Sequence, residues 1–291
     1  MKILIADAFD ASLPERLKRF GEVTTDSAEL SSAEVVLVRS KTKCTKEYIE
    51  SAPKLKLIIR GGVGTDNIDK EAAKAAGVEV KNTPKASSPA VAELAFAMLI
   101  AIPNRLIEAH NSMKEGKFLK SEIKRTELLG KTLGLIGVGR IGTEMAKRAK
   151  AFGMKVIGTD KVVQQSDVVE MKSMDEVLSQ SDYLSLHTPL TDETKGMINK
   201  AAIAKMKDGV AIVNTGRGKC VVEEDLVEAL TSGKVKAYAT DVWYSDPPDP
   251  SCPILKAPNV IMAPHLGAST KENLKRISDE VVELLEAYQK K

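Results

Sequence analysis

Short apolar runs alternate with helical patterns along almost the whole chain, and this alternation limits the possible folds more than any other feature. The expected strands are Lys2–Ala6, Val35–Arg39, Leu57–Arg60, Val78–Lys81, Thr132–Ile136, Lys155–Thr159, Tyr183–His187, Val210–Asn214, Val235–Thr240 and Asn259–Ala263. Several of them are uninterrupted apolar runs, as expected for strands that are buried on both faces. The sequence therefore predicts an α/β fold with parallel sheets and right-handed crossover connections.

The strand–helix pattern forms two series, one before about residue 90 and one from about residue 132, and a length of 291 residues suits two domains. A long helical pattern, Val91–Ala109, separates the two series and is a candidate bridge between domains. The last helical pattern, Lys271–Ala287, has no strand after it. The pattern alone allows that helix to cover either domain.

Composition excludes several classes of function. The formal net charge is only +3 and the lysines are spread along the chain, so the sequence gives no electrostatic case for nucleic acid. The apolar stretch Val91–Ile102 contains Glu93 and is too short to cross a bilayer, and no secretory signal is visible. Cys44, Cys220 and Cys252 lie far apart without metal-ligand spacing. We therefore expect a cytoplasmic protein with reduced thiols and no metal.

A glycine-rich turn follows the expected strand Thr132–Ile136 and precedes a helix-forming run. In its sequence GVGRIG, Gly137 permits a tight turn and Gly139 lets backbone amides approach a pyrophosphate. Gly142 allows close packing of the helix on the strand. The positive end of the helix dipole would then face the phosphates. This arrangement predicts a dinucleotide site, although an empty structural turn or a methyltransferase of the same fold would use similar glycines.

The next strand ends at Asp160, which lies 18 residues after the last glycine (160 − 142). An acid at this place accepts hydrogen bonds from the ribose 2′-hydroxyl and repels a 2′-phosphate. It therefore favours NAD over NADP. Lys161, the next residue, weakens that preference.

Hydride transfer at a carbinol carbon needs a base for the hydroxyl proton and a cation for the substrate carboxylate. The chain has three histidines. His110 lies in a polar helical stretch and is interpreted as a surface residue. His187 ends a strand at the edge where α/β sheets bind ligands, and a supporting role there is favoured over catalysis. His265 lies in the loop APHLGAST after another strand and is the candidate acid/base.

Two further side chains complete the candidate chemistry. Arg217 lies between two glycines in NTGRG, directly beyond the strand Val210–Asn214, where its planar cation suits a carboxylate or a polarised carbonyl. A surface charge is the alternative. Asp246, in DVWYSDPP, would raise the pKa of an imidazole and fix its tautomer. On the residues alone it could equally be a turn residue before Pro247.

Taken in order, these motifs resemble the D-isomer-specific 2-hydroxyacid dehydrogenase family, and the resemblance covers essentially the whole chain. The matching segments are VRSKT, GGVGTDNID, NTP, VAEL, GLIGVGRIG, LHTPLTDETKGMIN, NTGRG, EDLVEAL, DVWYSDP and APHLGAST. The resemblance implies two Rossmann-like, doubly wound parallel-sheet domains with a cleft between them. The substrate domain would comprise residues 1–92 plus 267–291, including the last helix, and the NAD-binding domain residues 93–266. It also implies a homodimer or homotetramer.

Carried over residue by residue, the resemblance makes Arg217, Asp246 and His265 catalytic, and gives the backbone amides of Val63 and Gly64 to the substrate carboxylate. The residues that it assigns to the cofactor NAD are Gly137, Gly139, Arg140, Ile141, Gly142, Asp160, His187, Thr188, Pro189, Thr215 and Asp241, the last on the nicotinamide carboxamide. The family usually has Glu where Asp246 stands. Since Asp is shorter by roughly 1.5 Å, one C–C bond, we expect its pair with His265 to need a closer backbone or a bridging water. The segment after Asp160 is also shorter than usual.

Among this family, VRSKT and IIRGGVGTDNID are most similar to 3-phosphoglycerate dehydrogenases, in a short form without a C-terminal regulatory domain. The implied reaction is oxidation of 3-phospho-D-glycerate in serine synthesis. Arg39 and Arg60 are then candidates for the substrate phosphate, because two guanidinium groups match a dianion; surface charge or interdomain pairing is the alternative. Other possibilities are a glyoxylate or hydroxypyruvate reductase, a D-lactate dehydrogenase, and an NAD-sensing corepressor.

Overall fold

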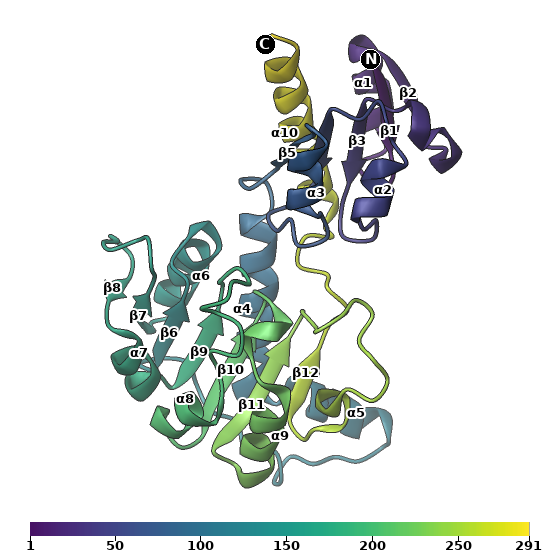
Figure 1. Cartoon of the computed structure of the whole chain (residues 1–291). Coiled ribbons are helices and arrows are strands. Elements are labelled where there is room, and N and C mark those ends of the chain that lie inside the picture. The colour runs from purple at the N-terminus through teal and green to yellow at the C-terminus, as the bar shows by residue number, and fades with distance from the viewer. Residues whose placement is uncertain (291) are drawn as a thin grey trace. The chain divides into compact units, whose positions relative to one another are not determined.

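The computed structural model describes residues 1–290 and divides into two compact units. Unit 1 comprises Met1–Ser88 and the segment from Ala268 onward, and unit 2 is Pro89–Gly267. The boundaries thus lie at 88/89 and 267/268, whereas the sequence placed them at 92/93 and 266/267. Figure 1 labels the elements of both units.

Unit 1 is built on a parallel sheet of five strands in the order β2-β1-β3-β4-β5. The strands are β1 (Lys2–Ile5), β2 (Glu22–Thr24), β3 (Val35–Val38), β4 (Leu57–Arg60) and β5 (Glu79–Asn82). The helices are α1 (Leu13–Leu17), α2 (Lys46–Glu50), α3 (Lys70–Ala75) and α10 (Lys271–Gln289), with short 3₁₀ turns at Lys18–Phe20 and Ser27–Ser32. This strand order is one of the two common doubly wound arrangements.

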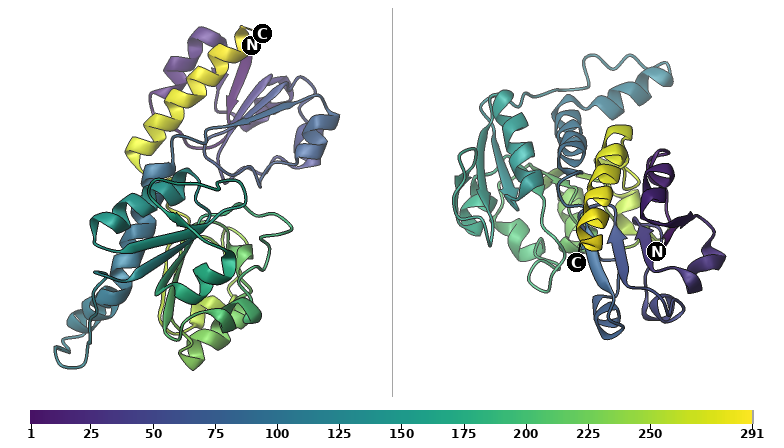
Figure 2. Two further views of the ribbon diagram at one scale, coloured as in Figure 1. Left: turned by 90° about the vertical axis from the view of Figure 1, so that its left-hand side faces the viewer. Right: turned by 90° about the horizontal axis from the view of Figure 1, so that it is seen from above.

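The two faces of the unit 1 sheet carry separate cores because successive strand residues point to opposite sides. Ile3 packs with residues of α1 and α10, while Leu4 packs on the other face with residues of α2 and α3. Figure 2 shows α10 and α1 side by side. Helix α10 is capped by Thr270, whose hydroxyl accepts the Asn273 amide at 3.0 Å, and its buried residues include Ile277. The C-terminal helix therefore belongs to unit 1, which the strand pattern alone left open.

Unit 2 contains a parallel sheet of seven strands in the order β12-β11-β10-β9-β6-β7-β8. The strands are β6 (Thr132–Ile136), β7 (Lys155–Thr159), β8 (Glu170–Met171), β9 (Tyr183–Leu186), β10 (Val210–Asn214), β11 (Val235–Thr240) and β12 (Val260–Met262). The helices are α4 (Ser88–Asn104), α5 (Leu106–Lys114), α6 (Arg140–Ala151), α7 (Met174–Gln180), α8 (Lys200–Lys205) and α9 (Glu223–Ser232), with 3₁₀ turns at Gly218–Cys220 and Pro253–Lys256. Helices α4 and α6 cover one face, and α7, α8 and α9 cover the other. The predicted α/β fold with two parallel sheets is confirmed.

The single helix expected at Val91–Ala109 is wrong, because the chain forms two helices there. Helix α4 ends at Asn104, and α5 starts after Arg105, whose φ of 47° places it in the left-handed region. Pro103 lies in the last turn of α4 and cannot donate the amide hydrogen bond to residue 99 that a regular helix makes, which weakens that turn. The two helices are bent by 66°. Among the described residues no single helix has the length and apolarity to span a membrane, although the bent pair satisfies both criteria jointly.

Candidate active site

The glycine turn between β6 and α6 has the geometry that the sequence predicts. Gly137 adopts a φ of 97°, and a Cβ added there would lie 2.8 Å from the carbonyl carbon and oxygen of His187. A Cβ on Gly142 would overlap the carbonyl oxygen of Gly137, so the start of α6 packs directly on the turn. A Cβ on Gly139 meets nothing within 4 Å in the described chain. Because Gly139 caps α6, its open side faces a helix N-terminus that suits a pyrophosphate.

Asp160 stands at the end of β7, beside this turn. Its carboxylate accepts the amide of Val138 at 2.7 Å, and those of Val162 and Val163 at 2.8 and 3.0 Å. Burial raises the pKa of Asp160, but these three hydrogen bonds outweigh burial and lower it overall. The residue is therefore an anion that joins the glycine turn to the segment after β7. Its contact with a ribose stays a prediction.

His187 follows β9, the strand next to β6. Its ring nitrogens lie 2.9 Å from the Ser185 hydroxyl and 3.4 Å from the Thr215 hydroxyl. Burial lowers the pKa of His187 to about 4, so the ring is neutral near physiological pH. A half-buried neutral ring held by two hydroxyl groups suits a supporting role better than proton transfer.

The loop that carries Arg217 is ordered by Asn214, the last residue of β10. The Asn214 side chain is fully buried, accepts the Gly216 amide at 3.0 Å and donates to the carbonyl of Arg217 at 3.0 Å. It also donates to the Tyr238 hydroxyl at 3.1 Å. Sequence reasoning missed this residue. The available signal was an amide side chain at the end of the otherwise apolar run VAIV.

His265 and Asp246 form a direct pair. The imidazole Nδ1 lies 2.5 Å from a carboxylate oxygen of Asp246, and the two side chains are 35% and 42% exposed. Asp246 is therefore more than a turn residue, and the shorter side chain reaches the ring without a bridging water. His265 has a φ of 57°, a left-handed conformation that is uncommon outside glycine and that occurs preferentially at functional sites.

The backbone around His265 is held by buried groups on the segment after β11. Asp241 is 2% exposed, and its two carboxylate oxygens accept the amides of Leu266 and Gly267 at 2.7 and 2.8 Å. The indole of Trp243 donates to the carbonyl of Ala263 at 3.1 Å. Burial raises the pKa of Asp241, although the two amides partly oppose this. Asp241 thus positions the histidine loop, a role that the sequence did not reveal, and its predicted contact with a nicotinamide carboxamide stays a prediction.

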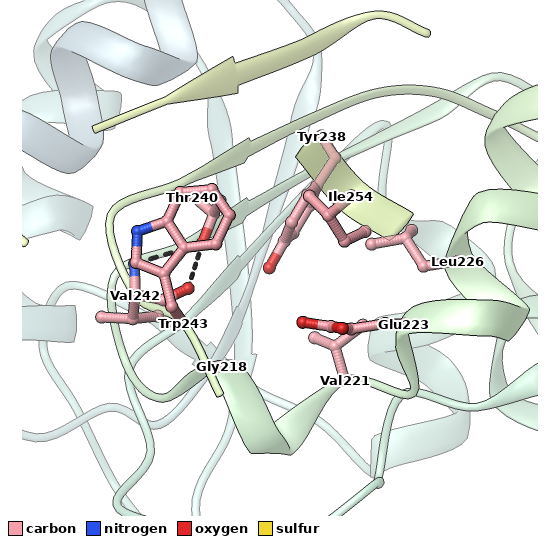
Figure 3. A pocket seen from close by; sticks show the side chains of 9 residues that line it. All are labelled: Gly218, Val221, Glu223, Leu226, Tyr238, Thr240, Val242, Trp243 and Ile254. Atoms are coloured by element: carbon pink, nitrogen blue, oxygen red, sulfur yellow. Dashed lines mark hydrogen bonds between the residues drawn. The ribbon is translucent and has the colours of Figure 1, made fainter. Parts of the chain in front are cut away.

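A small pocket lies beneath the arginine loop (Figure 3). Its lining residues are Gly218, Val221, Glu223, Leu226, Tyr238, Thr240, Val242, Trp243 and Ile254. Thr240 donates its hydroxyl to the Val242 carbonyl at 2.8 Å, which fixes the turn after β11. A Cβ on Gly218 would clash with the backbone of Trp243. The arginine loop therefore packs directly against the segment that leads to Asp246.

Strand order explains why these loops meet. Strands β10, β11 and β12 are neighbours, and Arg217, Asp246 and His265 follow their carboxyl ends in that order. Strand β10 also neighbours β9, and β9 neighbours β6, which leads into the glycine turn. Ligands of open α/β sheets bind at the carboxyl ends of the strands, where the strand order reverses. Unit 2 therefore brings the glycine turn and the His–Asp pair to one edge of its sheet.

The four candidate substrate residues belong to unit 1. Arg39 directly follows β3, and Arg60 is the last residue of the adjacent strand β4. In the register of the two strands Val38 lies opposite Arg60. The guanidinium of Arg39 donates to the carbonyl of Ala268 at 3.1 Å, and burial lowers its pKa despite the nearby charge of Asp7. Arg39 therefore has a structural role in unit 1, whether or not it also binds substrate.

The loop with Val63 and Gly64 is fixed from β5 and the residue after it. The side-chain amide of Asn82 donates to the carbonyl of Val63 at 2.6 Å, and the Thr83 hydroxyl accepts the Gly62 amide at 2.7 Å. The loop is thus held by hydrogen bonds to two neighbouring side chains. In residues 1–290, no group of three or more His, Cys, Asp or Glu side chains could hold a metal ion.

Comparison with known proteins places the site in a family. The NAD-binding domain model of the D-isomer specific 2-hydroxyacid dehydrogenases matches residues 96–267. The chain is 47% identical to the hydroxypyruvate reductase of Thermotoga maritima, covering 90% of this chain and 89% of that one. It is 43% identical to the D-3-phosphoglycerate dehydrogenase of Methanocaldococcus jannaschii over 97% of this chain, but spans only 56% of that relative.

A solved structure gives the same result for the fold. The D-lactate dehydrogenase of Aquifex aeolicus, complexed with NAD and lactic acid, superposes with a TM-score of 0.88 at 34% identity. The match covers 99% of this chain and 95% of the other. The matched region contains the glycine turn and the His–Asp pair described above. The chain therefore belongs to the D-isomer-specific 2-hydroxyacid dehydrogenase family, with an NAD-binding domain in unit 2.

Proposed function

We propose that this chain interconverts 3-phospho-D-glycerate and 3-phosphohydroxypyruvate with NAD. When bound, NAD supplies the carbon that accepts or returns the hydride. The observation that carries the proposal is the direct contact between His265 and Asp246, at the sheet edge that also bears the arginine loop. Replacement of His265 by alanine tests the catalytic part.

The roles of the side chains follow from their bonding. With Nδ1 of His265 turned to Asp246, the free Nε2 takes the proton of the substrate 2-hydroxyl. The negative charge of Asp246 stabilises the imidazolium that results, and it fixes the tautomer beforehand. Arg217 supplies a planar cation that orients the substrate carboxylate and the developing carbonyl. Asn214 and Asp241 act through the backbone and hold the arginine and histidine loops in place.

The phosphorylated substrate is supported by two guanidinium groups on adjacent strand ends of unit 1. Arg39 and Arg60 lie where β3 and β4 end, and a phosphate dianion needs charge of that kind. The likeness to the phosphoglycerate dehydrogenase of M. jannaschii, over nearly the whole of this chain, supports the same assignment. Because the chain spans only about half of that relative, its substrate is a proposal.

Hydroxypyruvate reduction is the second candidate, and two observations favour it. The relative from T. maritima matches over 89% of its own length and is named for that activity. In addition, the Arg39 guanidinium already donates to a main-chain carbonyl. Hydroxypyruvate and 3-phosphohydroxypyruvate share a carbon skeleton and differ only in the phosphate. The two functions are therefore separated by one chemical group.

Replacing Arg60 by alanine separates the two candidates. For a phosphate-binding Arg60 we expect kcat/KM for 3-phosphohydroxypyruvate to fall about 10- to 100-fold, since one charge-assisted hydrogen bond contributes about 1.5–3 kcal/mol. The value for hydroxypyruvate should change less than about twofold. Steady-state NADH oxidation with both substrates measures this, with Arg105→Ala, between α4 and α5 of unit 2, as the control. Equal losses for both substrates, or a wild-type preference for hydroxypyruvate, would contradict the proposal that the substrate is phosphorylated.

We also propose that the protein is a homodimer in solution. Large apolar side chains on α5 and in the segment after it are exposed, namely Leu106, Ile107, Met113, Phe118 and Leu129. Such exposure on one segment is typical of an association surface. Light scattering should give twice the chain mass for the wild type and the chain mass for the Leu106→Glu/Ile107→Glu variant. Val162→Glu, at a highly exposed site elsewhere, should leave the mass unchanged, and a monomeric wild type would refute the dimer.

A further inference from the structure

An ion pair joins two loops of unit 2 at the carboxyl edge of its sheet. The ammonium of Lys161, directly after Asp160, lies 2.6 and 2.8 Å from the two carboxylate oxygens of Glu193. Glu193 belongs to the loop after β9, 32 residues further along the chain. Both side chains are exposed, at 78% and 65%, so the pair contributes little to the stability of the fold. Its position points to a different role.

The backbone near Lys161 is fixed by Asp160. The carboxylate of Asp160 accepts the amides of Val162 and Val163, and the Gln164 side chain donates to the carbonyl of Lys161 at 3.1 Å. Lys161 therefore starts beside the acid that the doubly wound fold places at the adenosine ribose. Without a partner, its ammonium group would lie in reach of a 2′-phosphate and would attract it.

The loop that carries Glu193 is also ordered. The Thr194 hydroxyl donates to the carbonyl of Pro189 at 2.7 Å, and the Lys195 amide donates to the carbonyl of Thr191 at 2.9 Å. Glu193 is thus presented toward Lys161 from a formed turn. With the glutamate the charge of Lys161 is paired, and without it the ammonium group is left beside Asp160 alone.

We propose that Glu193 is a specificity residue for the cofactor: it neutralises Lys161 and thereby excludes nucleotides with a 2′-phosphate. The inference rests on NAD binding by unit 2 and is independent of the substrate proposed above. Asp160 repels the 2′-phosphate directly. Glu193 acts indirectly, by forming an ion pair with Lys161, the residue after Asp160. The sequence alone indicated only that Lys161 weakens the preference for NAD; the ion pair removes that conflict.

The test is nucleotide binding by titration calorimetry, with no turnover required. For Glu193→Gln we expect NADP⁺ and 2′-phospho-ADP-ribose to bind about three- to tenfold more tightly than to the wild type. The affinities for NAD⁺ and ADP-ribose should change less than about twofold. The gain for the 2′-phosphorylated nucleotides should shrink at high salt, because the released lysine is exposed.

Two controls make the result specific to this pair. The double variant Glu193→Gln/Lys161→Gln should return to wild-type affinity for NADP⁺, because the gain requires the freed ammonium group. Glu228→Gln breaks a similarly exposed ion pair between Glu228 of α9 and Lys200 of α8. It should leave every nucleotide affinity unchanged. An unchanged affinity of Glu193→Gln for 2′-phospho-ADP-ribose, or a gain that persists in the double variant, would overturn the proposal.

Discussion

Replacing His265 by alanine is expected to lower kcat about 10²- to 10⁴-fold, the usual contribution of a general acid/base. The physical reason is that His265 is the side chain at this sheet edge whose free ring nitrogen can take a hydroxyl proton, since its other nitrogen is bonded to Asp246. Steady-state oxidation of NADH with a 2-oxo acid measures the loss. Calorimetric binding of NADH should stay within about twofold of the wild type, because the lost group acts on the substrate.

Two variants show whether the loss belongs to the acid/base pair. Asp246→Asn keeps the shape of the partner but removes its charge, so kcat should fall with it, because the imidazolium formed in the reaction loses its stabilising anion. His110→Ala, at an exposed position on α5, should be neutral. A His265→Ala enzyme with near-normal turnover would exclude the mechanism.

Gly137→Ala is expected to cause the second large effect, a loss of both fold stability and NAD binding. The position has a φ of 97°, and a Cβ there would lie 2.8 Å from the carbonyl carbon of His187, so both the conformation and the space oppose a side chain. Strain of this kind costs about 1–3 kcal/mol, and the backbone contact adds to it. Thermal unfolding should show a clear fall in Tm, and calorimetry should show at least about tenfold weaker NAD binding.

Two other glycines separate these causes. Gly209→Ala tests positive φ alone, because Gly209 has a φ of 73° and open space around it, so it should destabilise the fold mildly without affecting NAD. Gly139→Ala tests approach of the cofactor alone, since its φ of −68° suits any residue. It should weaken NAD binding with little change in Tm. If Gly137→Ala bound NAD normally, the proposed cradle would be incorrect.

The sequence predicted ten strands, and the structure contains all of them within one residue at each end. Strands β2 (Glu22–Thr24) and β8 (Glu170–Met171) were missed. Both are short edge strands with largely exposed or half-buried residues, so they lack the apolar run on which the prediction relied. The break between α4 and α5 was missed for a related reason: apolar spacing does not report a left-handed residue such as Arg105.

At the site, the residue types were predictable and their bonding was not. Arg217, Asp246 and His265 each follow a strand, so strand order alone brings them to one edge. The sequence could not show that both carboxylate oxygens of Asp241 would accept backbone amides of the histidine loop, because that depends on a turn formed 25 residues later. The ion pair of Lys161 with Glu193 could not be predicted for the same reason, since the charge pattern of a sequence does not specify which residues of two loops meet.

The return of α10 to unit 1 has a consequence for how the chain is completed. One face of the first sheet is covered in part by Ile277, Val281 and Leu285, which are synthesised after the whole of unit 2. Until those residues leave the ribosome, the earliest strands are covered on that side only in part, by residues such as Leu13 and Leu17 of α1. The second unit, whose core residues are contiguous in the chain, can therefore mature before the first.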